Sequence, residues 1–490
     1  MPALSLPLST AAVLTSAALL TALACATREH RRTELAIEHV NVVDVERGTL
    51  LPDRTVVIRD GRIASVDTAP NVVTRGARLV DGRGKYLMPG LWDMHTHVDD
   101  GAAWIFPASV AMGITGMRDL GSTLERIREW RNDTLGKRAP RVVAAGPIIM
   151  GVTNDTDPRV VAVRTGEEAR RVVDSLGIAG VDLIKVYDWV TVEAYRAIAD
   201  AARARGLAVV GHLPIEVDPD VAIAAGHRSI EHDGNAEGGL LLHASRDART
   251  YLAAARANVG KPFNPAMLVG SWAPAEIQRF LDSFDEVRAD SIARALARGG
   301  VFVTPTMYSY SRAWLLPPDS ALLRAPGRDL LPNERGTMHD AMVREYHRSP
   351  PATSAAAAHA RLYDVRARLV RSLHRSGVLL LAGTDLAPYP GGFPGYALHN
   401  ELAELQSVGL SPSDALRAAT LNPARYFAAD TMGVVRVGTV ADLVLLNANP
   451  LADVRNTLHI EAIVLRGELI DRAARAALLE EARRSASRAR

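Results

Sequence analysis

The feature that most constrains the fold is a repeated alternation of short Val/Ile-rich runs with helical stretches across residues 89–430. Short apolar runs separated by helices are typical of βα units with parallel strands. The sequence therefore predicts an α/β fold, in which eight parallel strands form a (β/α)₈ TIM-like barrel with its chemistry at their carboxyl ends. The eight runs end near His97, Asp119, Gly146, Tyr187, His212, His232, Thr306 and Asp385.

Local signals place two of the intervening helices and two long loops. One helix is expected over 192–204 and another over 219–225, where Asp218 could cap the first turn and Gly226 end the last. The connections 233–300 and 307–377 are much longer than the others. Because both follow strands, we expect them to lie over the mouth of the barrel and to wall a substrate pocket.

Strand-like alternation also occurs near both ends of the chain. Residues 35–44 and 54–59 alternate in this way, and so do 438–447 and 460–470. We expect these two groups to pair into one small β-sandwich domain. The expected organisation is a β-domain from 33–88 and 431–472, a barrel over 89–430, and a C-terminal helix or tail over 473–490.

Residues 1–25 resemble a secretory signal peptide. No charged side chain occurs from Met1 to Thr27, and an apolar stretch ending in small residues precedes Cys25. The stretch is too short and too rich in Ser and Thr for a firm membrane span. Lys and Arg are missing before the apolar stretch, which departs from the usual secretory signal. Ala22-Leu23-Ala24-Cys25 resembles a bacterial lipobox, although that pattern prefers a larger apolar residue at the position of Ala22. We expect export to the bacterial periplasm, either free or tethered to the membrane by a lipid on Cys25.

Composition narrows the class of partner. Hydrophobic residues make up 48% of the chain and charged residues 23%, as in ordinary soluble globular proteins. The formal net charge is +2 and no segment concentrates Lys and Arg into a stripe, so a nucleic-acid partner is not expected. Cys25 is the only cysteine, which excludes an intrachain disulfide. The sequence leaves open whether the chain forms a homo-oligomer.

His95 and His97 stand two residues apart at the end of the first barrel strand. Side chains at i and i+2 of a strand point to one face, here the barrel interior. Two converging neutral imidazoles suit Zn or a similar divalent metal. An isolated His-x-His motif is as often structural, so its meaning depends on the other strand ends.

Lys185 lies at the end of the fourth run, among apolar residues. An isolated ammonium would be costly to bury there. Either Lys185 pairs with an acid at the strand end, or its neutral amine takes up CO₂ to form a carbamate whose two oxygens can bridge two cations. Both interpretations stay open on the sequence.

Three further strand ends carry residues that can bind metals. His212 ends the fifth run, His232 ends the sixth, and Asp385 follows the eighth. An acid at the last strand end suits both metal coordination and proton transfer. His227 is close to His232 in the sequence but precedes the strand, so His232 is the preferred candidate.

These motifs resemble those of the amidohydrolase superfamily, and the resemblance covers nearly the whole chain after the signal. Lys185 makes the chain similar to binuclear, carboxylated-lysine members, and the Xaa-Pro dipeptidase-like and exported amidohydrolases are the nearest-looking branch. The stretches that carry the resemblance are Pro89–His97, Gly113–Asp119, Ser229–His232, Ala382–Asp385, Ala415–Ala424 and 438–446.

The resemblance implies a ligand set and a reaction. His95, His97 and Asp385 would bind one divalent ion, His212 and His232 the other, with Zn as the expected metal. A carbamate on Lys185 and a hydroxide would bridge the two ions. The implied reaction is hydrolysis of an amide C–N bond in a dipeptide or an N-acyl amino acid, with Asp385 as the catalytic proton-transfer residue.

Other side chains near the mouth are candidates for substrate contact. Tyr187 could act in catalysis by hydrogen-bonding the tetrahedral oxygen, could bind a substrate carboxylate, or could simply pack. Arg118 could bind a substrate carboxylate or pair with Asp119 or another interior acid. Thr306 is a further substrate-binding candidate, while Thr304, Tyr308 and His399 are weaker ones.

Two other functions stay open on the sequence. The same site could hydrolyse lactones or phosphoesters, because the attacking group would be the same. The chain could also be a non-catalytic binding lipoprotein that keeps the barrel as a scaffold. That second alternative predicts a damaged ligand set, whereas all six expected ligands are present.

Overall fold

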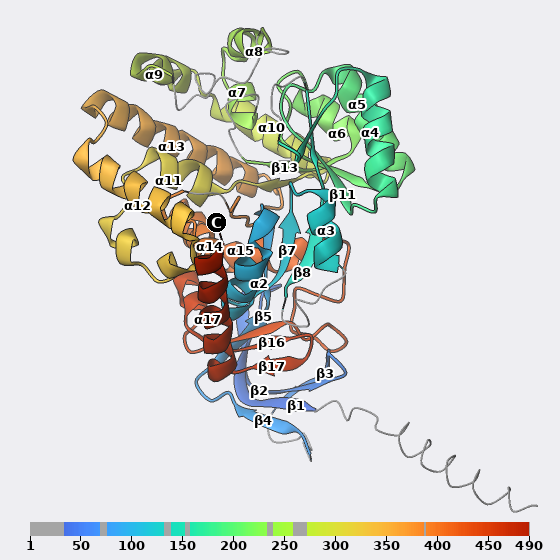
Figure 1. Ribbon diagram of the computed structural model, residues 1–490, viewed down its shortest axis with the longest axis vertical. Coiled ribbons are helices and arrows are strands. Elements are labelled where there is room, and N and C mark those ends of the chain that lie inside the picture. Colours follow the sequence, from blue (N-terminus) through green and yellow to red (C-terminus); the bar gives the residue numbers. More distant parts are fainter. Residues whose placement is uncertain are drawn as a thin grey trace, which may run out of the picture.

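The computed structural model describes residues 34–68, 76–131, 139–151, 157–232, 239–257, 272–386 and 389–489. Within them the chain forms a barrel surrounded by helices, with a β-domain below it (Figure 1). The expected signal peptide and Cys25 lie outside the described residues. In the described part, no helix combines the length and the apolar character needed to cross a membrane.

Parallel strands form the barrel wall. They occur in two sheets, β6-β7-β8 and β10-β9-β11-β12-β13-β14. The two sheets are joined where Asp182 N, directly before β11, donates to Ala144 O of β8 (2.9 Å). On the other side, Met94 N of β6 donates to Ala382 O of the eighth predicted run (2.9 Å). The strands are β6 (Leu91–Thr96), β7 (Ile114–Asp119), β8 (Arg141–Ala144), β9 (Ile148–Met150), β10 (Val160–Ala162), β11 (Leu183–Val186), β12 (Ala208–Gly211), β13 (His227–Glu231) and β14 (Phe302–Thr304).

The eighth predicted run, 378–384, closes the barrel without forming a regular strand. It reaches β14 through a parallel bridge between Val303 and Leu380, and Thr384 N donates to His95 O of β6 (3.0 Å). A Cβ on Gly383 would lie 2.6 Å from the Cβ of His95, so only glycine permits this close approach. The predicted TIM-like barrel is therefore confirmed, with β9 and β10 as additional short strands that the sequence pattern did not predict.

Both locally predicted helices are present as α5 (Val192–Ala204) and α6 (Pro219–Ala225). Gly226 ends α6 in the left-handed conformation, as predicted. The prediction that Asp218 caps this helix is wrong, because its carboxylate makes no capping hydrogen bond. Asp218 Oδ1 instead accepts from Arg256 Nη2 at 2.8 Å.

The remaining helices surround the barrel or lie beyond one of its ends. Those next to the barrel are α2 (Ala102–Ala111), α3 (Leu124–Arg131), α4 (Gly166–Ile178), α10 (Glu286–Arg298), α13 (Thr353–Arg375), α14 (Tyr396–Ser407), α15 (Pro412–Ala419) and α16 (Leu421–Tyr426). A short 3₁₀ turn, η1 (Asp99–Gly101), precedes α2.

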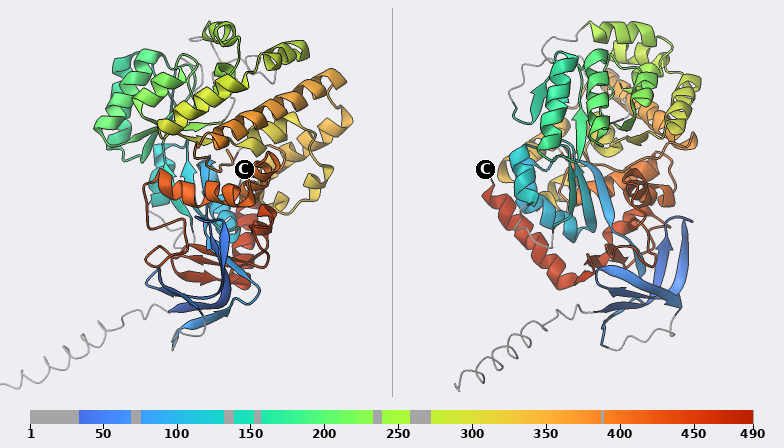
Figure 2. Two further views of the ribbon diagram at one scale, coloured as in Figure 1. Left: turned by 180° about the vertical axis from the view of Figure 1, so that it is seen from behind. Right: turned by 90° about the vertical axis from the view of Figure 1, so that its right-hand side faces the viewer.

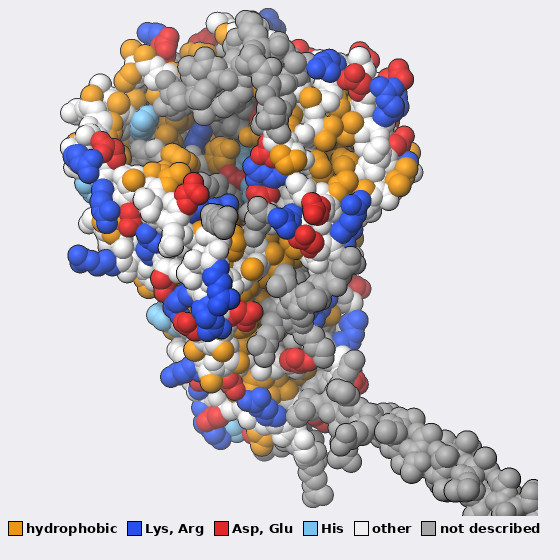
Figure 3. Space-filling model, in the orientation of Figure 1, with side chains coloured by type: hydrophobic (Ala, Val, Ile, Leu, Met, Phe, Trp, Pro, Cys, Tyr) orange, Lys and Arg blue, Asp and Glu red, His pale blue; other side chains and the backbone are white. Residues whose placement is uncertain are grey.

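The two long connections contain several short helices. The first holds α7 (Leu240–His243), α8 (Ala248–Arg256) and α9 (Pro274–Asp282). The second holds η5 (Met307–Arg312), α11 (Ala313–Leu315), η6 (Ser320–Arg324), η7 (Arg328–Leu330) and α12 (Asn333–Arg348). Both connections lie beyond the end of the barrel that faces away from the β-domain (Figures 1 and 2). The surface on this face is hollowed between α11–α13 and the lobe that carries α4–α6 (Figure 3).

The N- and C-terminal strands form one mixed eight-stranded sheet, which confirms the predicted β-sandwich domain. Its order is β17-β16-β15-β5-β1-β2-β3, with β4 paired to β1. Its elements are β1 (Leu35–Asp44), β2 (Thr49–Arg59), β3 (Arg62–Thr68), β4 (Arg78–Asp81), β5 (Tyr86–Pro89), β15 (Leu443–Leu446), η8 (Val454–Leu458), β16 (Ile460–Leu465) and β17 (Glu468–Ile470). The chain then forms helix α17 (Arg472–Arg488), which packs against α2.

Candidate metal centre

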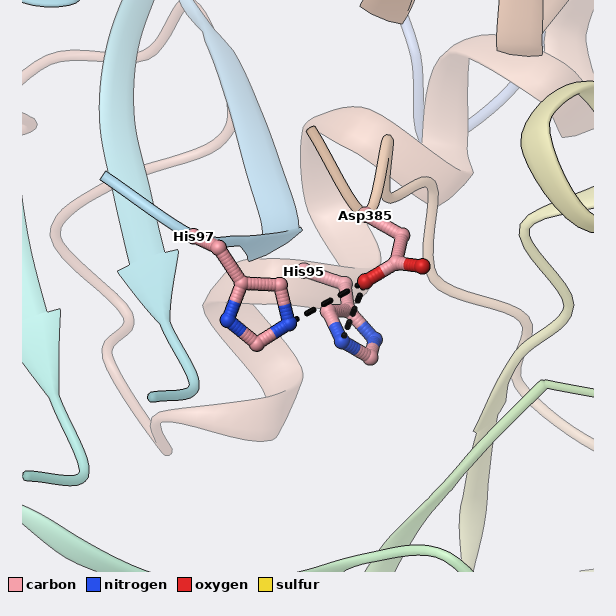
Figure 4. A group of neighbouring side chains, drawn as sticks. All are labelled: His95, His97 and Asp385. Atoms are coloured by element: carbon pink, nitrogen blue, oxygen red, sulfur yellow. Dashed lines mark ion pairs between the residues drawn. The ribbon is translucent and has the colours of Figure 1, made fainter. Parts of the chain in front are cut away.

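His95, His97 and Asp385 converge at the mouth of the barrel (Figure 4). Asp385 Oδ1 lies 3.3 Å from His95 Nε2 and 3.1 Å from His97 Nε2. One ligand atom from each of the three side chains lies within 4.8 Å of the other two. The two histidines come from the end of β6, and Asp385 follows the eighth run, so the strand order brings distant residues together as predicted.

Backbone bonds and a buried acid hold Asp385 in place. Asp385 N donates to His95 O at 2.7 Å, and Asp385 has a positive φ of 49°. The carboxylate of Asp93 accepts from Thr384 N (3.0 Å) and Thr384 Oγ1 (2.7 Å), which ties β6 to the loop that carries Asp385. Burial raises the pKa of Asp93 to about 7.

Carboxylates fix the orientation of two buried imidazoles. His95 Nδ1 lies 3.0 Å from Glu231 Oε2, and His212 Nδ1 lies 2.9 Å from Asp188 Oδ2. An ionised carboxylate can only accept, so each Nδ1 carries the proton and each Nε2 is the unprotonated ring nitrogen. His95 Nε2 is buried and makes no hydrogen bond. A buried imidazole nitrogen left in this way is a fit for a metal ion.

A hydroxyl does the same for the third imidazole. His232 Nδ1 lies 2.6 Å from Thr306 Oγ1, and the Thr306 hydroxyl donates to Pro305 O at 2.8 Å. Because that hydroxyl has one proton, it must accept from His232 Nδ1, which leaves Nε2 of His232 as a lone pair. Burial lowers the pKa values of His95, His212 and His232 well below the usual range, so all three are neutral, as metal binding requires.

The four histidine rings form a continuous group. Ring centroids are 5.4 Å apart for His95 and His97, 4.8 Å for His95 and His232, and 5.0 Å for His212 and His232. His227, which the sequence argument set aside, has a different environment: Nδ1 contacts Tyr195 Oη (2.8 Å) and Nε2 contacts Ser229 O (2.8 Å). His227 is therefore fully occupied by structural contacts.

Lys185 is buried beside this group, on β11. Burial lowers the pKa of its ammonium to about 8, against the opposing charges of Glu231 and Asp385. Among the described residues, Lys185 Nζ has neither an ion pair nor a hydrogen bond. Among the described residues, therefore, Lys185 does not pair with an acid at the strand end.

Arg118 lies inside the barrel rather than at its mouth. The side chain is fully enclosed, with Nη2 donating to Glu231 Oε1 (2.7 Å) and Nε donating to Met94 O (2.6 Å). The expected contact of Arg118 with a substrate carboxylate does not fit this position, because no part of the guanidinium is open. The pairing alternative fits, with Glu231 rather than Asp119 as the acid.

Thr306 is also enclosed, and its hydroxyl is used by His232 and Pro305. It positions a histidine, and its expected role in substrate binding does not fit this geometry. Thr304 Oγ1 accepts from Arg118 Nη2 (3.3 Å), and His399 contacts Thr457 Oγ1 (2.8 Å) and Met112 O (2.9 Å). Both are therefore structural in this arrangement.

Two half-buried tyrosines cover the histidines on the mouth side. The Tyr187 ring lies 3.8 Å from the His212 ring, and the Tyr310 ring lies 3.8 Å from the His232 ring. Tyr187 is placed where the sequence argument expected it. Tyr310 was missed, although it lies in the Tyr308-Ser309-Tyr310 stretch directly after the seventh strand.

Glu231 and Asp188 were also missed. Each acid directly adjoins a predicted site residue, Glu231 before His232 and Asp188 after Tyr187. That adjacency is the signal that could have identified them, since histidines that bind metals commonly donate their other ring nitrogen to a carboxylate.

Comparisons with known proteins agree with this fold. A family model described as the amidohydrolase family matches residues 271–470. A Bifidobacterium longum protein described as a candidate prolidase is 25% identical, with a TM-score of 0.62 over 92% of this chain and 99% of that one. The bottromycin amidohydrolase is 24% identical, with a TM-score of 0.68 over 93% of this chain and 91% of that one, and shows the shared fold.

Among curated proteins, adenine deaminase 3 of Rhizobium meliloti (strain 1021) is 24% identical over 246 residues, which is 45% of this chain. The matched part spans only 39% of the length of that relative. Fold and site define an α/β-barrel protein with a candidate metal centre at the barrel mouth. Residues 271–470 are similar to the amidohydrolase family, and the fold is similar to that of the candidate prolidase.

Proposed function

We propose that this chain is a metal-dependent amidohydrolase that cleaves the amide C–N bond of a dipeptide or an N-acyl amino acid. One observation carries the proposal: three buried, neutral imidazoles each donate Nδ1–H to an oxygen, and His95 Nε2 is buried without a hydrogen bond beside Asp385 Oδ1 and the ring of His97. Neutral imidazoles with an unprotonated Nε2 suit divalent metal ions.

His95, His97 and Asp385 would hold one ion, and His212 and His232 the second, with Zn as the expected metal. A carbamate on Lys185 would lie between them. The support for this modification is that Lys185 Nζ is buried without an ion pair among the described residues. Bound ions would polarise the scissile carbonyl and lower the pKa of water.

The protein's own groups would move the proton and orient the substrate. Asp385 is the one acid among the six expected ligands, and its side chain is 14% exposed toward the mouth. It would take the proton of the attacking water and pass it to the leaving nitrogen. Tyr187, half-buried against His212, would hydrogen-bond the substrate carbonyl oxygen as negative charge develops there.

The names of the similar structures support an amide substrate, since they include a candidate prolidase and an amidohydrolase. Lactones and phosphoesters are the alternative substrate classes for the same site. A binding protein without catalysis is disfavoured because the sequence keeps all six expected ligands, and His95, His97 and Asp385 lie together.

Two measurements on one preparation test the proposal. Protein reconstituted with Zn²⁺ and bicarbonate should contain about two metal ions per chain by elemental analysis. It should hydrolyse members of a panel of dipeptides and N-acyl amino acids in preference to lactones, phosphotriesters and adenine. Absence of bound metal after reconstitution would overturn the proposal.

Lys185 allows a sharper test of the carbamate. Lys185→Ala should lose metal and activity, and both should return in part when a short carboxylic acid such as propionate is added, because it can supply the missing oxygens. Lys85→Ala, in the β-domain, is the matched control and should behave as wild type. Full metal content in Lys185→Ala without added acid would contradict the bridging role.

We further propose that the protein is exported and processed at residues 1–25, with or without a lipid on Cys25. The support is the sequence pattern alone. Cell fractionation of wild type and Cys25→Ala tests it. Recovery of the wild-type protein only in the cytoplasm would contradict export, while equal release of both proteins into the periplasm would contradict the lipid.

A further inference from the structure

Arg118 on β7 is fully enclosed inside the barrel, where its guanidinium is held by three other strands, β6, β13 and β14. Nε donates to Met94 O (2.6 Å), Nη1 donates to Ser229 Oγ (2.8 Å), and Nη2 donates to Glu231 Oε1 (2.7 Å) and Thr304 Oγ1 (3.3 Å). A planar guanidinium bound through all three nitrogens has one orientation, so its positive charge has a fixed place beside Glu231.

Glu231 on β13 connects this guanidinium to His95. Oε1 of the carboxylate accepts from Arg118 Nη2 and from Ser229 Oγ (2.5 Å), whereas Oε2 lies 3.0 Å from His95 Nδ1. The side chains of Arg118, Glu231 and His95 are all 0% exposed. The other ring nitrogen, His95 Nε2, lies 3.3 Å from Asp385 Oδ1 in the candidate metal centre (Figure 4). Direct contacts therefore lead from Arg118 through Glu231 to an expected metal ligand.

Glu231 needs a cationic partner, because an isolated carboxylate is costly to enclose. Among the residues that the structure describes, Arg118 is the one Lys or Arg that forms an ion pair with Glu231. The charge of Lys185 also interacts with that of Glu231, but in the proposed carbamate form Lys185 is no longer cationic. Without Arg118, the carboxylate that orients His95 would lose this counter-charge and would keep only the Ser229 hydroxyl at Oε1.

We propose that Arg118 is a positioning residue of the metal centre, which acts through Glu231 to hold the His95 ring in the orientation and tautomer that bind a metal ion. The inference rests on the proposed function, because His95 is one of the ligands proposed there. A histidine ligand depends on the position of the carboxylate that accepts from its other ring nitrogen. The guanidinium fixes that position by its fork of coplanar donors as well as by its charge.

A double-mutant cycle on the affinity for Zn²⁺ tests whether Arg118 acts through Glu231. The four proteins are wild type, Arg118→Met, Glu231→Gln and the double variant, each titrated with Zn²⁺ against a chelator in the presence of bicarbonate. Arg118→Met should lower the affinity by about 10-fold and Glu231→Gln by about 10- to 100-fold. The double variant should bind Zn²⁺ no more weakly than Glu231→Gln, because the connection from Arg118 to His95 is already broken. Arg118→Lys, which keeps the charge but not the fork, should lie between wild type and Arg118→Met.

Arg475→Met is the matched control, since Arg475 is a half-buried arginine whose Nε donates to Ala111 O (2.9 Å) at the contact of α17 with α2. It should lower thermal stability and keep the wild-type affinity for Zn²⁺. Thermal unfolding shows which variants are folded, and if Arg118→Met does not fold, the cycle is completed with Arg118→Lys.

Two results would overturn the role of Arg118 and leave the proposed function intact. One is wild-type affinity for Zn²⁺ in the folded Arg118 variant. The other is a pair of losses that multiply in the double variant, because Arg118 would then act on the barrel independently of Glu231. Wild-type protein that binds no Zn²⁺ would overturn the proposed function, and the role of Arg118 with it.

Discussion

At the scale of single residues, the oxygen beside each imidazole decides what the imidazole can do. Glu231, Asp188 and Thr306 each occupy one Nδ1 and so leave Nε2 as the unprotonated nitrogen. None of the three would itself contact a metal ion. They set the tautomer, and with it the position of the lone pair that can coordinate.

Asp188→Asn tests that dependence. The substitution keeps the shape of the side chain but removes the charge that holds the proton on His212 Nδ1, so metal affinity should fall by about 10- to 100-fold. Competition with a metal chelator measures the affinity. Asp200→Asn, an exposed acid on α5, serves as control. Unchanged affinity in Asp188→Asn would show that Asp188 has no influence on the ligand.

Asp385→Asn tests the proton-transfer role. The amide cannot accept a proton from the attacking water, so kcat should fall by about two to four powers of ten. The comparison is made at equal metal content, because Asp385 is also an expected ligand. A variant that binds both ions and retains wild-type turnover would remove Asp385 from the proton path.

The candidate metal ligands could be predicted from the sequence, because the carboxyl ends of all barrel strands lie at the same end of the barrel. The partners of those ligands could not be predicted with the same certainty. Arg118 is the clearest example: a guanidinium at the end of the second strand could face the mouth or the interior, and only its contact with Glu231 on β13 decides. The orientation of the Arg118 side chain depends on packing across the barrel, which a local sequence pattern does not indicate.

At the scale of elements, the turn η5 connects the site to the helices around it. Glu401 on α14 accepts from Met307 N (3.0 Å) and Tyr308 N (2.7 Å), at the start of η5. A buried carboxylate thereby satisfies the donors at the beginning of this turn. The same turn presents Tyr310 to His232 and directly follows Thr306, which has a positive φ of 47°.

Glu401→Gln should weaken this anchor. A neutral amide oxygen accepts less strongly than a carboxylate, so the free energy of unfolding should fall by about 1–3 kcal/mol. Urea unfolding measures the change. Glu345→Gln, at an exposed position of α12, should change stability by less than about 0.5 kcal/mol. Equal stability of the two variants would show that Glu401 does not anchor η5.

The regular helices and strands could be predicted because their periodicity is local. The short strands β9 and β10, three residues each, are too brief to show a period. The eighth run was predicted as a strand from its apolar pattern. In the structure it is not a regular strand, and Gly383 approaches His95 of β6 closely at this point. Asp218 was expected to cap α6, but its carboxylate accepts from Arg256 instead. Arg256 lies on α8, 38 residues later in the chain, so no local pattern indicates this contact.

At the scale of the whole molecule, buried neutral histidines outside the metal centre couple stability to pH. Burial lowers the pKa values of His243 and His399 to about 4, while histidines of an unfolded chain titrate near 6.5. Between these values the unfolded chain binds more protons than the folded one. Stability is therefore fully present above about pH 6.5 and is lost as pH falls toward 4.

Urea unfolding of metal-free protein at pH 7.5 and pH 5 should show this loss. His399→Gln should lose less stability than wild type between the two values, because one of the groups that resist protonation is gone. His399 can account for at most about 3 kcal/mol over its full range. An identical pH dependence in both proteins would exclude His399 as a contributor.

The continuity of β5 and β6 has a consequence for the order of assembly. Only Gly90 separates the two strands, and a Cβ there would lie 2.3 Å from Thr115 Oγ1, so the passage from sheet to barrel has no slack. β5 is paired on one side by β15, which is synthesised about 350 residues later. The position of β6, which carries His95 and directly precedes His97, therefore depends on β15, a strand that is synthesised near the end of translation. We expect that a ribosome-bound chain forms its individual helices early, but completes the barrel mouth around His95 and His97 only after β15 has been released.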